Sequence, residues 1–128
     1  MNLNQVTLPA TDVKASVEFY RRMGFTQIVD SPHYARFECA DGDSTFSVHH
    51  AGSVAPDSGV VIYFETKSID DEVKKLQAAG FVFDQMPQDE RWLWREARLR
   101  DPAGNIICIY WAGQNRKNPP WRLVSSER

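Results

Sequence analysis

Two segments of the chain carry apolar residues at helical spacing, with residues that favour helix ends on either side. The apolar positions are Val13, Val17 and Tyr20 in the first segment and Ile69, Val73 and Leu76 in the second. Asp12 and Ser68 precede them as N-caps, because their side-chain oxygens can accept amide protons of the first turn. Ser68 with Asp71 also comes close to a capping box. Gly24 and Gly80 follow where a left-handed residue ends a helix. The pattern predicts two amphipathic helices.

Short runs rich in β-branched and aromatic residues flank each helix and predict strands. Around the first helix they lie near residues 6–8, 26–29, 35–39 and 45–49, and around the second near 62–64, 82–85, 94–100 and 106–111. Turn-forming residues separate the strands at 30–32, 40–43 and 101–105, and residues 52–58 link the two halves. The predicted order of elements is therefore βαβββ, twice.

The second half of the chain repeats the first. A shift of about 56 positions superimposes four structural residues on their counterparts: Val13 on Ile69, Val17 on Val73, Gly24 on Gly80 and Phe25 on Phe81. Because the helix of a βαβββ module covers only one sheet face, two modules can curve around a shared cavity. We expect a single α+β domain over 1–128, with tandem βαβββ modules at about 1–51 and 59–112 forming curved mixed sheets around a cavity, followed by a tail over 113–128.

Composition narrows the classes of partner. The 128 residues are 42% hydrophobic and 25% charged, and the net charge of −2 offers no basic field for nucleic acid. Two cysteines, Cys39 and Cys108, match no metal-binding or redox spacing. The first residues lack the apolar run of a signal or anchor, and no stretch reaches membrane length. A cytoplasmic location with reduced cysteines is expected.

Two stretches carry a family resemblance. The helix with Phe19-Tyr20-Arg21, ending at Gly24-Phe25, and the stretch from Arg95-Glu96 to Asp101-Pro102-Ala103-Gly104-Asn105 resemble motifs of the vicinal oxygen chelate superfamily. That superfamily includes glyoxalase I, extradiol dioxygenases, fosfomycin-resistance enzymes and bleomycin-resistance binding proteins. The resemblance covers about residues 3–113. It implies the tandem βαβββ fold, which hosts several chemistries.

The resemblance also implies positions for a divalent metal on the first, fourth, fifth and eighth strands. These positions fall on Gln5, Ser47, Val61 and Cys108. Val61 has no donor atom and Ser47 is a poor ligand, whereas catalytic zinc sites usually have three protein ligands. The chain is therefore expected to hold no metal and to use no cofactor.

Three histidines are the natural acid–base candidates. His33 falls in a predicted turn, where a solvated side chain is expected. His49 and His50 are adjacent on a predicted strand, so they point to opposite faces. His49 shares its face with Ser47, where a cavity-wall residue is favoured over a general base. No catalytic residue is assigned.

Aromatic residues of the second half are expected to line the cavity, because such walls bury flat, partly polar ligands. Tyr110 shares the strand face of Cys108, whereas Trp111 is expected to pack in the core beside the helix. Trp92 and Trp94 fit a pocket rim, a dimer contact or the core.

Charged residues alternate over 95–100, which favours a solvated or edge strand. The alternative is that Arg98 or Arg95 points into the cavity and holds an anionic or carbonyl group. Asp101 most simply shapes the following turn.

Together these features predict a metal-independent binding protein similar to the bleomycin-resistance branch. It would be a homodimer that sequesters a planar, partly polar small molecule, with no nucleic-acid or membrane partner. The residues expected to line its pocket are Gln5, Thr7, Ser47, His49, Tyr63, Trp92, Arg98, Cys108 and Tyr110. One alternative is a glyoxalase I-like lyase or isomerase with a non-standard metal site, and another is a non-catalytic interaction module. In the tail, Trp121 is expected to dock on its own body or on a partner subunit, and the alternative is a disordered end.

Overall fold

Two four-stranded sheets, each accompanied by one helix, form the computed structural model, which describes residues 1–124. The chain divides into two compact units, Met1–Val60 with Arg100–Ile106, and Val61–Leu99 with the residues after Ile106. Each unit is described by itself below. None of the helices in the described residues is long and apolar enough to span a bilayer.

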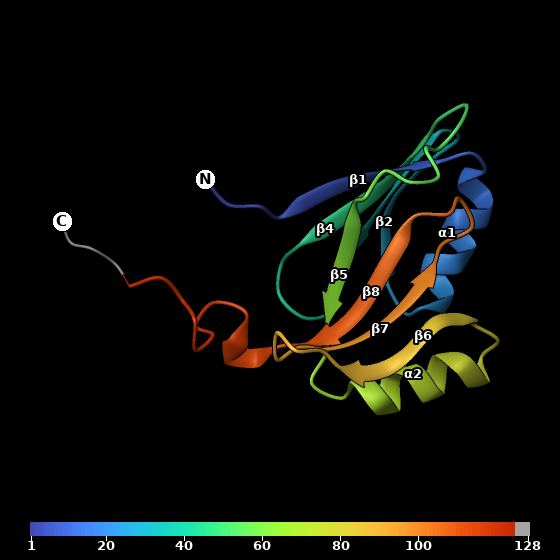
Figure 1. Cartoon of the computed structure of the whole chain (residues 1–128). Coiled ribbons are helices and arrows are strands. Elements are labelled where there is room, and N and C mark those ends of the chain that lie inside the picture. Colours follow the sequence, from blue (N-terminus) through green and yellow to red (C-terminus); the bar gives the residue numbers. More distant parts are fainter. Residues whose placement is uncertain (125–128) are drawn as a thin grey trace. The chain divides into compact units, whose positions relative to one another are not determined.

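The first unit contains the elements β1 (Gln5–Ala10), α1 (Val13–Arg22), β2 (Thr26–Ser31), β3 (Tyr34–Glu38) and β4 (Thr45–His50). Its sheet has the order β1-β4-β3-β2. Strand β1 is parallel to β4, whereas β3 is antiparallel to both β4 and β2. The sheet is therefore mixed, and α1 lies along one of its faces (Figure 1).

The second unit contains β5 (Val61–Glu65), α2 (Ile69–Ala78), β6 (Phe83–Asp89), β7 (Arg95–Arg100) and β8 (Ile106–Trp111), followed by a short 3-10 helix, η1 (Gly113–Asn115). The sheet order is β5-β8-β7-β6, and α2 packs beside β6 (Figure 1). The predicted α+β class and the doubled βαβββ order are confirmed.

The two helices begin differently although their sequence patterns match. Asp12 caps α1 as predicted, because its side chain accepts a hydrogen bond from the Ala15 amide at 3.1 Å. The Ser68 side chain makes no capping bond at the start of α2, so the predicted capping box with Asp71 is wrong. At the other ends, Gly24 and Gly80 have the positive φ angles expected of residues that end a helix.

An aromatic cluster fills the space between α1 and the first sheet. Tyr20, on α1, lies with its ring centroid 5.0 Å from that of Phe46 and 5.8 Å from that of Phe37. The Tyr20 hydroxyl donates to Asp101 Oδ2 at 2.7 Å, in a buried contact. Asp101 also accepts hydrogen bonds from the backbone of Ala103 and from the backbone and side chain of Asn105. Asp101 thus shapes its turn as predicted and also binds α1.

Strand alternation gives the first sheet one apolar and one polar face. Ala35, Phe37, Phe46 and Val48 are buried on the α1 side. On β3 and β4 the alternate positions carry polar groups, and Arg36 is the cross-strand partner of Ser47. This polar face continues onto β1, where Thr7 is the partner of Ser47.

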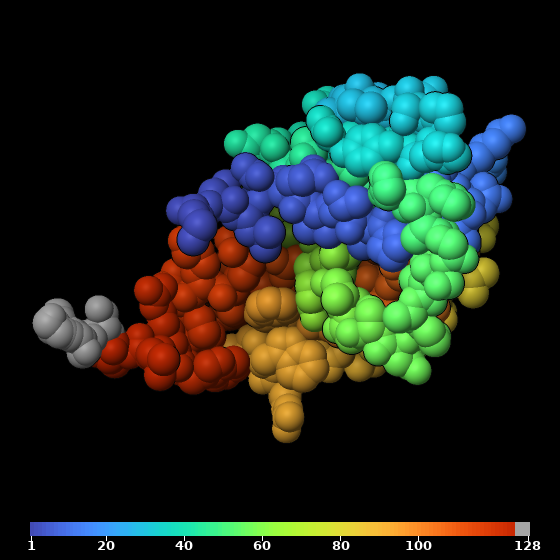
Figure 2. Space-filling model, turned by 90° about the horizontal axis from the view of Figure 1, so that it is seen from above, coloured from blue at the N-terminus to red at the C-terminus, as the bar shows by residue number. Residues whose placement is uncertain are grey.

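Two predictions about the second half are corrected. Strand β7 is an inner strand between β8 and β6, not an edge strand, and Glu96 on it is only 1% exposed. Trp111 is 36% exposed and not a core residue. Trp121 is 57% exposed within the chain, and its docking on a partner subunit stays a prediction. The segment over 113–124, in red in Figure 2, extends away from the sheet of its unit.

Candidate functional site

A hydrogen-bonded network occupies the polar face of the first sheet. Gln5, on β1, donates from Nε2 to Ser47 Oγ at 2.9 Å, and Thr45 Oγ1 donates to Gln5 Oε1. Ser47 Oγ lies 2.6 Å from the Tyr34 hydroxyl, and either atom can be the donor. Arg36 Nε donates to the same phenol oxygen at 3.0 Å. The network thus joins β1, β4 and β3 through side chains alone.

Sequence reasoning missed Tyr34 and Arg36. The alternation along β3 could have indicated them. Tyr34 and Arg36 alternate with Ala35 and Phe37, which are fully buried, so they lie on the opposite face of the strand. Ser47 on β4 is the cross-strand partner of Arg36. Hydrogen bonds from Ser47 and then Arg36 lower the pKa of the Tyr34 phenol, and the positive charge of Arg36 acts in the same direction.

Two further expected residues lie on this face. Thr7 is the strand partner of Ser47, and Gln5 Nε2 lies 3.4 Å from Thr7 Oγ1. The ring of His49 lies 6.1 Å from that of Tyr34, its cross-strand partner. His50 instead lies 5.6 Å from the ring of His33, as expected for adjacent strand residues that point to opposite faces.

Three aromatic rings form a corner on one face of the second sheet. The ring centroids of Trp94 and Tyr110 lie 4.9 Å apart. Tyr63, on β5, meets both rings edge-on, at 5.7 Å from Trp94 and 5.3 Å from Tyr110. Tyr110 is buried, whereas Trp94 is half-buried and Tyr63 is 41% exposed. We call Tyr63, Trp94 and Tyr110 the aromatic corner.

A buried carboxylate lies on the same sheet. Glu96 accepts a hydrogen bond from the indole Nε1 of Trp92 at 2.7 Å and one from Arg98 Nη2 at 3.1 Å, on different oxygens. Arg98 is therefore already paired with a carboxylate of its own strand. Arg95 binds Asp70 on α2 and Asp89 on β6, so it does not join this group.

Cys108 lies beside the aromatic corner. Its side chain is fully buried and packs in one cluster with Tyr110 and Ala112, against Val61 and Trp94. Burial, and then the negative charge of Glu96, raise the pKa of the Cys108 thiol to about 12. The sulfur therefore stays protonated at neutral pH and acts as a weak hydrogen-bond donor rather than as a nucleophile. Both cysteines are free thiols.

The four positions at which the family resemblance implies metal ligands do not fit a metal ion. Gln5 and Ser47 are bonded to each other and to their neighbours, and Val61 has no donor atom. Cys108 would have to lose a proton that its surroundings hold strongly. Glu65, further along β5, accepts instead from the backbone amides of Ala112 and Gly113. In residues 1–124, no three His, Cys, Asp or Glu side chains gather closely enough to hold a metal.

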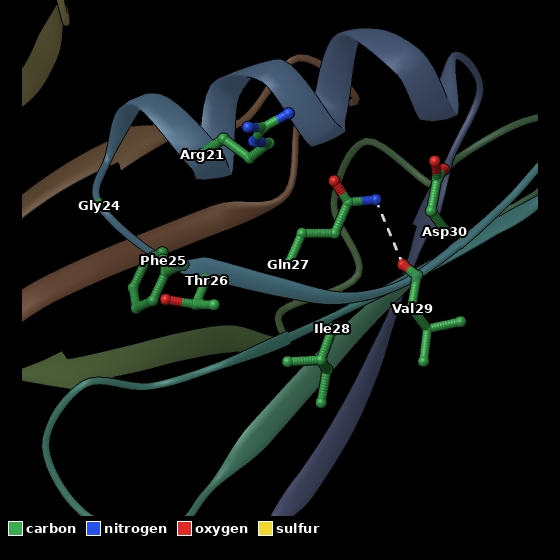
Figure 3. Close-up of a pocket in the computed structure, with 8 residues that line it drawn as sticks. All are labelled: Arg21, Gly24, Phe25, Thr26, Gln27, Ile28, Val29 and Asp30. Carbon is green, nitrogen blue, oxygen red and sulfur yellow. Dashed lines mark hydrogen bonds between the residues drawn. The ribbon is translucent and has the colours of Figure 1, made fainter.

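An open surface depression of about 550 Å³ lies between the end of α1 and strand β2 (Figure 3). Its walls include Arg21, Phe25 and Ile28, and Gln27 Nε2 in it donates to the Val29 carbonyl at 3.2 Å. None of the residues expected to line a pocket lies here. The Gln27 side chain is thus hydrogen-bonded to the backbone of its own strand.

The expected pocket residues thus fall into two groups. The first group lies on the polar face of the first sheet and consists of Gln5, Thr7, Ser47 and His49. The second group belongs to the second unit, around the aromatic corner and Glu96, and consists of Tyr63, Trp92, Arg98, Cys108 and Tyr110. The residues that sequence reasoning did not single out for the pocket are Tyr34, Arg36 and Glu96.

Comparison with known proteins identifies proteins that are similar to this chain. A protein of Bacillus subtilis (strain 168) called uncharacterized protein YraH is 26% identical over 127 residues, which cover 86% of this chain and 98% of that protein. A bleomycin-binding protein complexed with bleomycin matches with a TM-score of 0.72 and 16% identity, over 87% of this chain and 98% of that chain.

A lactoylglutathione lyase from Agrobacterium tumefaciens matches with a TM-score of 0.69 and 18% identity, over 86% of this chain and 92% of that chain. At such identities the structural matches establish the fold alone, and the two proteins named differ in function. The model of the Glyoxalase/Bleomycin resistance protein/Dioxygenase superfamily matches residues 2–109. The chain therefore belongs to the Glyoxalase/Bleomycin resistance protein/Dioxygenase superfamily.

Proposed function

We propose that this protein binds a planar, partly polar small molecule at the aromatic corner and holds it without a metal and without reaction. The observation that carries the proposal is the geometry of Tyr63, Trp94 and Tyr110, in which one ring meets two others edge-on. Such a corner offers a ring face and a ring edge to a flat ligand, the arrangements that aromatic pairs prefer. Tyr63 and Trp94 are accessible enough to receive it.

Polar groups near the corner would orient the ligand. The Glu96–Arg98 pair brings charged hydrogen-bonding groups close to the rings while its net charge stays zero. A site that is mostly apolar and has a few placed polar groups is typical of small-molecule pockets. Burial, then the charge of Glu96, raise the pKa of Tyr63, so its hydroxyl stays a neutral hydrogen-bond donor at physiological pH.

The donor chemistry at the implied metal positions supports a binding role. Val61 supplies no ligand atom, and Cys108 is held as a thiol. Similarity in fold to a bleomycin-binding protein, which was solved in complex with bleomycin, supports a ligand-binding role. We infer that the protein sequesters a harmful aromatic compound in the cytoplasm, as a homodimer.

The binding proposal is tested by titrating the full-length protein with a panel of planar aromatic compounds while following tryptophan fluorescence and thermal stability. We expect at least one compound to bind, and Trp94→Ala to weaken that binding by roughly tenfold or more, because a buried ring–ring contact is lost. Trp111→Ala is the matched control, since Trp111 is exposed and lies outside the corner. Equal loss in both variants would contradict the proposal.

The biological role needs a separate test. Cells that express the protein are challenged with the compounds that bind, and we expect survival to rise only for those compounds. Protection should disappear with Trp94→Ala and persist with Trp111→Ala. If binding is measured but no compound is tolerated better, the protein binds a ligand for another purpose, and sequestration of a toxin is wrong.

A further inference from the structure

The arginines of the strands differ in what they bind. Arg98 and Arg95 are both paired with carboxylates. Arg36 is also half-buried, but the only hydrogen bond of its side chain in residues 1–124 goes to the Tyr34 phenol. Part of the Arg36 side chain is removed from water, and an arginine in such a position is commonly paired with a group of opposite charge. Arg36 therefore carries a positive charge that the described part of the chain leaves unpaired.

The contacts of Arg36 leave one edge of its guanidinium open. Nε is used by the Tyr34 hydroxyl, and the guanidinium carbon lies 5.5 Å from the centroid of the Tyr34 ring. Neither contact uses the outer edge with the two terminal nitrogens. That edge presents two parallel N–H donors, the geometry that matches both oxygens of a carboxylate. Tyr34 thus orients Arg36 without neutralising it.

The Tyr34 hydroxyl can provide a further hydrogen-bond donor beside the guanidinium of Arg36. Its oxygen accepts from Arg36, and when Ser47 donates its own proton to Tyr34, the phenol proton points out of the network. Gln5 favours this arrangement, because its amide already fills one acceptor position of Ser47 Oγ. An anion beside Arg36 would then receive a further hydrogen bond from the Tyr34 hydroxyl.

The charges of the side chains around Arg36 favour one kind of anion. The neighbouring groups on this face of β1 and β4 are the neutral side chains Gln5, Thr7, Thr45 and Ser47, together with His49. Glu38 lies two residues after Arg36 on the same strand and forms no ion pair with it in residues 1–124. One unpaired cation with a carboxylate nearby suits a singly charged, planar anion better than a doubly charged phosphate.

We propose that Arg36 and Tyr34 form a binding site for the carboxylate of a small organic acid on the polar face of the first sheet. This goes beyond the proposed function, which places an aromatic ring on the second sheet and requires no charge on the ligand. It also assigns to Arg36 the anion-binding role that the sequence offered, as an alternative, to Arg98 or Arg95. Arg98 is paired with Glu96, whereas the terminal nitrogens of Arg36 make no side-chain hydrogen bond within residues 1–124.

The test compares benzoate with benzamide, which have the same ring and size but differ in charge. Full-length protein labelled with ¹⁵N in arginine is titrated with each, following the Nε–H signal of Arg36. We expect benzoate to shift this signal and to bind about tenfold or more tightly than benzamide, as for a charge-assisted hydrogen bond. Inorganic phosphate is the third probe and should bind more weakly than benzoate.

Arginine substitutions distinguish benzoate binding at Arg36 from a general effect of the protein's positive charges. Arg36→Gln should reduce benzoate binding to the benzamide level and leave benzamide unchanged, while Arg36→Lys should retain only part of the preference because it lacks the planar fork. Arg21→Gln removes the same charge from the exposed surface of α1 and should change nothing. A melting temperature near the wild-type value confirms that Arg36→Gln is folded.

Two results would overturn the proposal: equal binding of benzoate and benzamide by the wild-type protein, or a benzoate preference that survives in Arg36→Gln. Failure of benzoate to bind the wild-type protein also counts against it. The aromatic corner is judged separately with Trp94→Ala. If the preference for the carboxylate persists there, the Arg36 site stands whether or not the ring-binding proposal does.

Discussion

Cys108 and Tyr34 lie on the two sheets, and their neighbours shift their pKa values in opposite directions. Burial raises the pKa of Cys108 to about 12, with Glu96 adding to the effect. Hydrogen bonds from Ser47 and Arg36 lower the pKa of Tyr34. The residue type sets the unperturbed pKa. The surrounding groups shift that pKa and so decide which protonation state is present.

We expect Cys108 to resist alkylation in the native protein. A thiol with a pKa of about 12 is ionised to only about one part in 10⁴ at pH 8, and the thiolate is the reactive form. In the Cys39→Ser variant, iodoacetamide should react with Cys108 far more slowly than with a free thiol, as followed by mass spectrometry. Unfolding in urea is the control, since it should restore an ordinary rate. Rapid labelling of the folded variant would contradict this assignment.

The four tyrosines predict a split alkaline titration. The pKa values of Tyr20, Tyr63 and Tyr110 are raised, mainly by burial, whereas that of Tyr34 is lowered. A lowered pKa means that the phenolate forms at lower pH, so Tyr34 should ionise first. Ultraviolet difference spectra should show one early step that Tyr34→Phe removes. An early step that survives in this variant would assign the low pKa to another tyrosine.

At the scale of elements, two helices with matching patterns start in different ways. Asp12 makes its capping bond at the start of α1, whereas Ser68 makes no such bond at the start of α2. Instead, α2 has Asp70, Asp71 and Glu72 in its first turn, where negative charges interact favourably with the helix dipole. The same kind of cap residue therefore contributes to one helix and not to the other.

We expect Asp12→Ala to lower the free energy of unfolding by about 1 kcal/mol, the usual cost of losing an N-cap bond. Ser68→Ala should change it by no more than about 0.5 kcal/mol, as for an exposed residue without a specific contact. Urea denaturation of both variants measures the difference. Equal losses would show that the Ser68 side chain does cap α2 in solution.

The hairpin between β6 and β7 contains a strained position. Leu93 is the one residue other than glycine in the described chain with a positive φ, at 70°. The same turn is closed by hydrogen bonds from Leu93 N to Glu90 O and from Glu90 N to Trp94 O. It carries Trp92, whose indole binds the buried Glu96. The strained residue thus lies between Trp92, which binds Glu96, and Trp94 of the aromatic corner.

We expect Leu93→Gly to be more stable than Leu93→Ala by about 1 kcal/mol, because glycine adopts a left-handed conformation without the clash of a Cβ. Both variants lose a similar exposed side chain, so their comparison isolates the backbone effect. Chemical denaturation gives the two free energies of unfolding. A less stable glycine variant would indicate that the turn relaxes out of this conformation in solution.

For the whole molecule, the proposed state is a homodimer that needs no metal. Native mass spectrometry of protein purified without chelators should show twice the mass of the chain, with no stoichiometric metal. An organic mass that copurifies would be a direct lead to the ligand. One metal ion per chain would contradict the metal-independent proposal, and a monomer at micromolar concentration would contradict the dimer.

Much of the architecture was determined by the sequence alone. Periodicity over one or two turns predicts both helices, Gly24 and Gly80 mark their ends, and Asp101 with the following residues predicts a turn. The internal repeat then predicts the doubled βαβββ order. These features depend on neighbours within a few residues, so they can be read along the chain. Strand alternation likewise placed Gln5, Thr7, Ser47 and His49 on one face.

Only the tertiary structure decided which charged side chains pair with one another. Strand order placed β7 inside its sheet and buried Glu96, and that carboxylate then occupied Arg98. The cross-strand register placed Arg36 beside Ser47 and Tyr34, with no carboxylate partner in residues 1–124. The pairing of a side chain depends on which distant strands become its neighbours. Local patterns cannot specify this, because the same alternation fits an edge strand and an inner strand equally well.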